Sequence, residues 1–211
     1  MKCAIIANGN IKYYEEINPL IQKCDYIICA DGGARHLLKM DIVPHMIVGD
    51  LDSIDEETKI YFEKKDIVFC KFPRKKDYTD MELAIEYALK KGANEIIFLG
   101  AIGSRMDHTI ANITLLKPLE EKGIKGKIID EHNEIMITGG ELEIEGQIGD
   151  TVSIIPLSEK VEGITLKGFE YPLKNATVLM GSSIGISNRL MDKKAKIIIK
   201  KGKVLVIKAR D

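Results

Sequence analysis

The stretch Met46-Ile47-Val48-Gly49-Asp50-Leu51-Asp52-Ser53-Ile54 decides the fold class. Its first half is an apolar run with strand character, and Gly49 lets the chain turn sharply after that run. The pattern Ser53-x-x-Glu56 predicts a capping box that opens a helix over Asp55–Lys65. A strand that ends in acidic residues just before a helix is typical of the ligand-binding edge of an open α/β sheet.

Asp50 and Asp52 form an acidic pair directly after this strand. Two carboxylates held about 5 Å apart repel each other by roughly 3 kcal/mol at an effective dielectric of 20. A cation reverses the sign of this interaction, and Mg²⁺ carrying a polyphosphate is the usual choice. Because a single D-x-D motif is also common in solvated turns, the assignment depends on what the other strands carry.

The first 130 residues repeat the strand–turn–helix unit. Besides the opening strand, we expect strands at Cys3–Ala7, Tyr26–Ala30, Ile67–Phe72, Glu95–Gly100 and Lys127–Asp130. The expected helices are Ile11–Lys23, Ala34–Met40, a helix from a second capping box (Thr79-x-x-Glu82) to Lys91, and a helix from an N-cap at Asp107 through Leu116. This alternation predicts an α/β domain over residues 1–130, with a mainly parallel sheet and helices on both faces.

The carboxyl ends of parallel strands share one edge of the sheet, so polar residues that are scattered in the sequence converge there. One strand ends at Asp31, before Gly32-Gly33, and the next ends at Asp50 and Asp52. A later strand is followed by Gly103-Ser104-Arg105, which offers backbone amides, a hydroxyl and a guanidinium to phosphate oxygens. The convergence of these residues carries more weight than any single motif among them.

Some of these residues have simpler explanations that the sequence leaves open. Gly32-Gly33 can form a plain tight turn, and His108 can be an ordinary helix-surface histidine. Asp80 can complement the dipole of the helix that it opens, or it can be a third metal carboxylate, with Lys76 reaching a phosphate.

The hydrophobic period changes after His132-Asn133. Glu141–Glu145 alternates strictly, and Thr151–Ile155 and Ile164–Leu166 are short strand-like runs. Ala195–Lys200 and Val204–Lys208 are expected to form a hairpin around Lys201-Gly202-Lys203. These patterns predict an all-β sandwich domain over residues 131–211.

Composition narrows the function classes. With 45% hydrophobic and 30% charged residues, the 211-residue chain has the composition of an ordinary globular protein. A formal net charge of −1 argues against general binding to nucleic acid or acidic membranes. The four cysteines show no C-x-x-C pairing, no run reaches membrane-spanning length, and the short apolar start does not fit a signal peptide. We therefore expect a cytoplasmic protein.

The usual nucleotide fingerprints are missing. The chain contains neither G-x-x-x-x-G-K-[ST] nor G-x-G-x-x-G, and no Ser–His–acid or Cys–His set stands out. Carboxylates, glycine turns and basic residues at one sheet edge suit metal-assisted chemistry on a polyphosphate. From the residues alone, the expectation is a Mg²⁺-dependent enzyme that acts on a nucleotide.

Four sequence blocks resemble those of thiamine pyrophosphokinases and occur in that family's order. The blocks are Ala30–Ala34 (ADGGA), Gly49–Ser53 (GDLDS), Lys76–Asp80 (KDYTD) and Gly103–Thr109 (GSRMDHT). Because a β-domain carrying Ser187-Asn188 follows, the resemblance covers nearly the whole chain. It implies Mg²⁺-dependent transfer of the pyrophosphoryl group of ATP to the hydroxyl of thiamine, giving thiamine pyrophosphate and AMP.

The resemblance also implies residue roles. It places Mg²⁺ on Asp50, Asp52 and Asp80, and it makes these three and Asp107 the catalytic carboxylates. It implies that phosphates of ATP are bound by Asp31, Gly32, Gly33, Lys76, Asp77, Thr79, Ser104 and Arg105. It implies that thiamine is bound by Asp107, His108, Ser187 and Asn188. Members of the family are homodimers with the thiamine site between subunits, so Ser187 and Asn188 are expected to come from the second chain.

One departure concerns thiamine. The chain contains no Trp, so a Tyr, a Phe or an apolar residue such as Met191 must supply any stacking contact with the thiamine rings. Two rival functions are a haloacid-dehalogenase-type phosphatase, in which the first Asp of D-x-D is the nucleophile, and a non-catalytic nucleotide- or thiamine-binding module. The motif follows the third expected strand rather than the first, which argues against the phosphatase.

Overall fold

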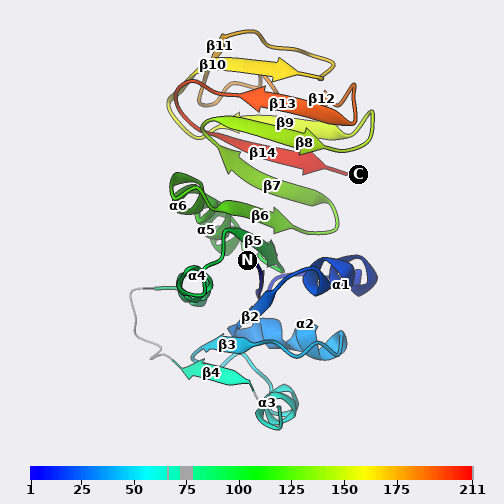
Figure 1. Ribbon diagram of the computed structural model, residues 1–211, viewed down its shortest axis with the longest axis vertical. Coiled ribbons are helices and arrows are strands. Elements are labelled where there is room, and N and C mark those ends of the chain that lie inside the picture. The colour runs from blue at the N-terminus through cyan, green and yellow to red at the C-terminus, as the bar shows by residue number, and fades with distance from the viewer. Residues whose placement is uncertain (66, 72–77, 211) are drawn as a thin grey trace. The chain divides into compact units, whose positions relative to one another are not determined.

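The structure is a computed structural model that describes residues 1–65, 67–71 and 78–210 (Figure 1). The chain divides into two compact units, Met1–Glu131 and His132–Asp211. The division lies next to the boundary that the sequence places after residue 130. In the described part of the chain, every helix is too short or too polar to span a lipid bilayer.

The first unit is built on a parallel sheet. Its strands are β1 (Lys2–Ile6), β2 (Tyr26–Ala30), β3 (Met46–Gly49), β4 (Val68–Lys71), β5 (Glu95–Leu99) and β6 (Lys125–Ile129). They pair in the order β6-β5-β1-β2-β3-β4, and each of these pairs is parallel. Strand residues such as Ile5, Ile28 and Ile96 are fully buried, which fits a sheet that is covered on both faces.

Helices cover both faces of this sheet (Figure 1). They are α1 (Tyr14–Gln22), α2 (Ala34–Lys39), α3 (Glu56–Glu63), α4 (Asp80–Lys90), α5 (Met106–Thr114) and α6 (Leu116–Glu121), with a short 3₁₀ turn at Asp31–Gly33. Figure 1 shows α1–α3 on one face and α4–α6 on the other. The change of face follows from right-handed crossovers, because the chain runs outward from β1 to β4 and then returns to β5 on the other side of β1. The α/β prediction is confirmed.

The two predicted capping boxes have different outcomes. At α4, Thr79 and Glu82 form the capping box as predicted. At α3 the prediction is wrong, because the N-cap is Asp55, whose side chain accepts a hydrogen bond of 2.8 Å from the Thr58 backbone N–H. Ser53 instead donates its hydroxyl to Asp52. An Asp N-cap needs no Glu or Gln side chain three residues on, so the Ser53-x-x-Glu56 spacing was misleading.

The second unit is a β-sandwich, as predicted. One antiparallel sheet has the order β12-β9-β14-β7 and the other has the order β11-β10-β13-β8. The strands are β7 (Asn133–Thr138), β8 (Glu141–Glu145), β9 (Thr151–Pro156), β10 (Lys160–Lys167), β11 (Ala176–Leu179), β12 (Asn188–Arg189), β13 (Lys194–Ile198) and β14 (Val204–Ala209). Their apolar residues form one core, in which Val152 and Val206 from one sheet join Val161 and Ile197 from the other.

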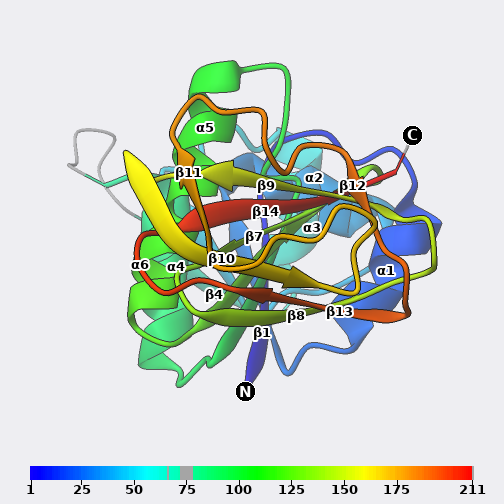
Figure 2. The ribbon, with the colours of Figure 1, turned by 90° about the horizontal axis from the view of Figure 1, so that it is seen from above.

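The predicted hairpin between the last two strands is wrong. β13 pairs with β8 and β10, whereas β14 pairs with β7 and β9 (Figure 2). After β13 the chain stays beside β10, where the Lys201 backbone N–H donates to the carbonyl of Glu162. It then crosses to the other sheet, which contains β14. β13 begins with alternating residues and β14 begins with the apolar run Val204–Ile207. Neither pattern distinguishes a corner between two sheets from a tight turn within one sheet.

Candidate active site

A cleft of about 810 Å³ lies at the carboxyl edge of the parallel sheet. Its walls come from the turns after β1, β2, β3 and β5, from the first turn of α4 and from α5 along its length. Side chains that line it include Asn8, Asp31, Arg35, Asp50, Asp80 and Arg105. β1 lies between β2 and β5, so the chain leaves neighbouring strands in opposite directions here. Such a switch point is where open α/β sheets bind ligands.

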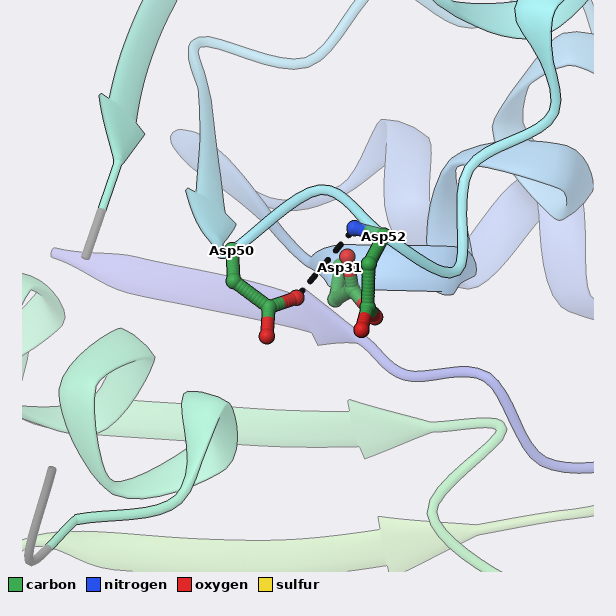
Figure 3. Close-up of side chains that lie close together, drawn as sticks. All are labelled: Asp31, Asp50 and Asp52. Atoms are coloured by element: carbon green, nitrogen blue, oxygen red, sulfur yellow. Dashed lines mark hydrogen bonds between the residues drawn. The ribbon is translucent and has the colours of Figure 1, made fainter. Parts of the chain in front are cut away.

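Three carboxylates gather in this region (Figure 3). Asp31, Asp50 and Asp52 each offer an oxygen, and these oxygens lie within 4.8 Å of one another. The backbone N–H of Asp52 donates to Oδ1 of Asp50 over 3.2 Å, which fixes the tight turn between the two residues. The predicted convergence of the β2 and β3 strand ends is therefore observed.

Asp31 has an environment unlike that of its neighbours. Its side chain is only 9% exposed, and its Oδ1 is buried without a hydrogen-bond partner among the described residues. Burial raises the pKa of Asp31, and the charges of Asp80 and Asp50 raise it further, while hydrogen bonds from Ser53 and the Gly32 backbone act in the opposite direction. The backbone φ of 43° places the residue in the left-handed region. A buried carboxylate oxygen without a donor is suited to a cation.

Gly49 makes the close approach of Asp31 and Asp50 possible. A Cβ at this position would lie 2.9 Å from the Cβ of Asp31, and its φ of 151° is unfavourable for other residues. The glycine before the D-x-D motif thus brings the end of β3 against the turn after β2.

This donor set fits a hard divalent cation, because its ligands are closely spaced carboxylate oxygens. The predicted metal set was Asp50, Asp52 and Asp80, with Asp31 assigned to phosphate. In the structure Asp31 is the third member of the close cluster, while Asp80 lines the cleft nearby and acts on the pKa of Asp31. Direct binding of phosphate by the Asp31 carboxylate is electrostatically unfavourable. This carboxylate is better suited to bind a cation that also binds the phosphate.

Asp31→Asn is expected to raise the melting temperature of the protein in EDTA at pH 7. The raised pKa means that the folded state disfavours the ionised carboxylate, so the fold is penalised at any pH above both the unfolded and the folded pKa. Asn removes that charge, keeps the shape and tolerates a left-handed backbone. Thermal unfolding with and without Mg²⁺ measures the effect. A lower melting temperature for Asp31→Asn in EDTA would contradict it.

The turn after β5 brings Ser104 and Arg105 to the cleft, as predicted, and the first turn of α5 brings His108 there. Asp107 is not among the lining residues, and the prediction that it caps α5 is wrong, because the N-cap is Arg105 and makes no side-chain capping bond. Asp107 forms an ion pair with the Arg105 guanidinium instead, with an Nη2–Oδ2 distance of 2.5 Å. That hydrogen bond is the main reason why the pKa of Asp107 is lowered to about 2.

Other predicted phosphate-binding residues have structural partners. Thr79 lines the cleft, but its hydroxyl donates to Glu82 and accepts from the Glu82 backbone N–H. Gly32 and Gly33 are buried in the 3₁₀ turn and are not among the residues that line the cleft. Lys76 and Asp77 lie outside the described residues.

The Ser187-Asn188 pair belongs to the second unit. Asn188 is 2% exposed, its side-chain oxygen accepts from the Tyr171 backbone N–H over 3.0 Å, and its amide donates to the Tyr171 carbonyl over 2.8 Å. Asn188 therefore fixes the backbone of Tyr171. Ser187 is exposed and has a φ of 54°, and its backbone N–H donates to the Ser153 hydroxyl.

Two groups at the cleft were not predicted from the sequence. They are the Asn8–Asn10 turn after β1, which has the pattern of a simple strand break, and Arg35. The Asn8–Asn10 turn follows a strand of a parallel sheet, and this position could have indicated that it lies at the ligand-binding edge. Arg35 lies five residues after the end of β2, inside a helix, and no local pattern pointed to it.

An α/β unit with an acidic cleft at the carboxyl edge of its sheet, followed by a β-sandwich, makes this chain a two-domain protein whose candidate ligand site lies in its α/β unit. Two family profiles match this chain: "Thiamin pyrophosphokinase, catalytic domain" over residues 17–128, and "Thiamin pyrophosphokinase, vitamin B1 binding domain" over residues 141–204. The chain belongs to the thiamin pyrophosphokinase family.

Known proteins of this family match the chain in both sequence and structure over nearly its full length. The chain is 34% identical to thiamine pyrophosphokinase of Bacillus subtilis, over 98% of each chain. The crystal structure of the Bacillus subtilis enzyme superposes with a TM-score of 0.91 at 32% identity, with both chains covered completely. That of a thiamin pyrophosphokinase from Geobacillus thermodenitrificans superposes with a TM-score of 0.87 at 28% identity, covering 100% of this chain and 98% of the other.

Proposed function

We propose that this enzyme transfers the pyrophosphoryl group of ATP to the hydroxyl of thiamine and depends on Mg²⁺. The observation that carries this proposal is the group of three carboxylates at the cleft, of which Asp31 and Asp50 line it and Asp31 has a buried oxygen without a hydrogen-bond donor among the described residues. A cation that neutralises both these carboxylates and a triphosphate suits the cleft better than either anion alone. The four free cysteines support a reducing compartment such as the cytoplasm.

In the proposed reaction, the thiamine hydroxyl oxygen forms a bond to the β-phosphorus of ATP. The bond from that phosphorus to the α–β bridging oxygen breaks, AMP leaves with the bond's electron pair, and a carboxylate accepts the hydroxyl proton. Asp31, Asp50 and Asp52 would hold Mg²⁺, with Asp80 adding negative charge close by. Bound there, Mg²⁺ would neutralise the charge that develops on the phosphate oxygens.

The side chains at the turn after β5 would position the substrates. Ser104, Arg105 and His108 line the cleft, and a hydroxyl and a guanidinium are groups that suit phosphate oxygens. While Asp107 is paired with Arg105 its pKa is about 2, so it is a weak proton acceptor at neutral pH. Binding of a phosphate by Arg105 would compete with this ion pair.

For thiamine, we infer that the site is completed by a second copy of the chain. The second unit carries exposed apolar side chains that include Leu179, Met180, Ile184, Ile186 and Met191, as expected of a surface that is covered in a homodimer. Phe169 and Tyr171 are the aromatic residues of this unit, and Phe169 is buried whereas Tyr171 is 63% exposed. Tyr171, held by Asn188, is therefore the aromatic side chain suited to stack on a thiamine ring in the absence of Trp.

The first experiment measures AMP and thiamine pyrophosphate formed from ATP, thiamine and Mg²⁺, with each component omitted in turn. Equal amounts of both products, abolished by EDTA, support the proposal. ADP with thiamine monophosphate would indicate a different kinase. Free phosphate without any need for thiamine would indicate a phosphatase, and ATP binding without turnover would indicate a non-catalytic module.

Mixing two inactive variants tests the shared site. Asp50→Asn disables the α/β unit and Ser187→Leu obstructs the site of the β unit, so each homodimer lacks an essential part. In a mixed dimer one of the two sites keeps both parts. We expect the mixture to recover up to about a quarter of the wild-type rate, because about half of randomly mixed dimers are heterodimers with one intact site of two. No recovery, in a mixture shown by mass spectrometry to contain heterodimers, would contradict a shared site.

A further inference from the structure

Arg35 is a cation at the cleft that has no role in the reaction proposed above. It lies in the first turn of α2, and its side chain lines the cleft. Its Nη2 donates to the carbonyl oxygens of Asn8 and Gly9 over 2.8 and 3.3 Å. In the part of the chain that the structure describes, Arg35 forms no ion pair, and its Nε and Nη1 make no hydrogen bond.

The contacts of Nη2 are not needed to hold the Asn8–Asn10 turn. The Asn10 backbone N–H donates to the carbonyl of Ile102 over 2.9 Å, and the Ala7 N–H donates to that of Leu99 over 2.8 Å. The buried His36 also binds this turn, since its Nε2 lies 2.8 Å from the Gly9 carbonyl oxygen. The bonds from Arg35 therefore mainly orient the guanidinium, which leaves donors available to a ligand.

Arg35 and Arg105 both line the cleft, but they differ in their partners, since carbonyl groups bind Arg35 and a carboxylate binds Arg105. Asp31, Asp50 and Asp80 make one part of the cleft acidic, and the guanidinium of Arg105 is engaged by Asp107. A ligand with several negative charges has to break an ion pair to bind Arg105, but it can bind Arg35 without doing so. Carbonyl partners orient a guanidinium without neutralising its charge.

We propose that Arg35 directly binds a phosphate group of the polyphosphate substrate, as a ligand-contacting residue distinct from the carboxylate cluster. The inference rests on the proposed function for the identity of the substrate, but it requires of that substrate only a chain of phosphates. Arginine suits this role because its planar fork donates charge-assisted hydrogen bonds to phosphate oxygens.

The test compares Arg35→Gln and Arg35→Lys with the wild type and with Lys39→Gln, which removes an equal charge from the same helix. Lys39 lies over the ring of Tyr14 and does not line the cleft. We expect Arg35→Gln to raise KM for ATP about 10- to 100-fold, the cost of losing charge-assisted hydrogen bonds. KM for thiamine should stay within about twofold, Arg35→Lys should be intermediate, and Lys39→Gln should match the wild type.

Competition by inorganic tripolyphosphate distinguishes direct phosphate binding by Arg35 from a purely structural role of this residue. Its inhibition constant against ATP should rise in Arg35→Gln by about the same factor as KM for ATP. If Arg35 only supports the Asn8–Asn10 turn, the variant will melt at a lower temperature and lose affinity for both substrates alike. That result, or an unchanged KM for ATP in Arg35→Gln, would overturn the inference. Failure of the wild type to form thiamine pyrophosphate would instead overturn the proposed function, and tripolyphosphate binding by calorimetry would then still test Arg35.

Discussion

Asp50→Asn and Asp52→Asn are each expected to lower kcat about 100- to 1000-fold at saturating ATP and thiamine, the range seen when one preorganised electrostatic group is removed. Each substitution replaces a carboxylate of the cluster by a neutral amide, so the cation proposed to bind there would lose both a ligand and a neutralising charge. The fold should survive, because Asp50 is only partly buried and Asp52 is exposed. Removing one of several repelling charges should also slightly raise the melting temperature in EDTA.

The Mg²⁺ dependence separates loss of metal binding from general damage. In both variants the Mg²⁺ concentration for half-maximal rate should rise, and stabilisation of the protein by Mg²⁺ in thermal unfolding should shrink. Glu57→Gln is the control, since it removes one exposed charge from the neighbouring helix α3, away from the cleft. Full turnover of Asp52→Asn at ordinary Mg²⁺ concentrations would contradict the assignment of Asp52 as a metal ligand.

The sequence predicted the part of this site that depends on strand ends. Apolar runs followed by acids or glycines located β2, β3 and β5, and parallel topology placed the ends of these strands at one edge. The prediction placed Asp80 with Asp50 and Asp52, whereas in the structure Asp31 joins the close cluster. That choice depends on the left-handed backbone of Asp31 and on the missing Cβ of Gly49, which are tertiary details.

Side-chain partners were predicted less well than backbone elements. Asp107 stands at a plausible N-cap position, yet it pairs with Arg105, because a guanidinium two residues earlier offers a stronger hydrogen bond than a backbone N–H. Asn188 was expected to contact thiamine, and its amide is used by the backbone of Tyr171. Residue types indicate which bonds a side chain can make, and the fold decides which of its neighbours takes them.

Gly9→Ala is expected to destabilise the first unit by about 3 kcal/mol, which is at the upper end of what overpacking usually costs. A Cβ at this position would lie 2.3 Å from the carbonyl oxygens of both Gly100 and Ile102. These are backbone atoms, so no side-chain rotation relieves the overlap. The Gly9 N–H also donates to the Gly100 carbonyl over 2.6 Å, and this bond would have to lengthen. A fall in melting temperature of roughly 10 °C should follow.

Activity should fall together with stability, because the two turns that Gly9 holds together both line the cleft. If they move apart, Asn8 and Arg105 shift relative to the carboxylates of β2 and β3, and a misplacement of about 1 Å can cost about 100-fold in rate. Gly140→Ala is the matched control, since a Cβ at that position would have no atom within 4 Å and its φ is not in the left-handed region. Circular dichroism melts and initial rates at about 20 °C measure both effects. A Gly9→Ala variant with wild-type melting temperature and rate would contradict this prediction. It would show that the turns after β1 and β5 do not pack against each other as closely as the structure indicates.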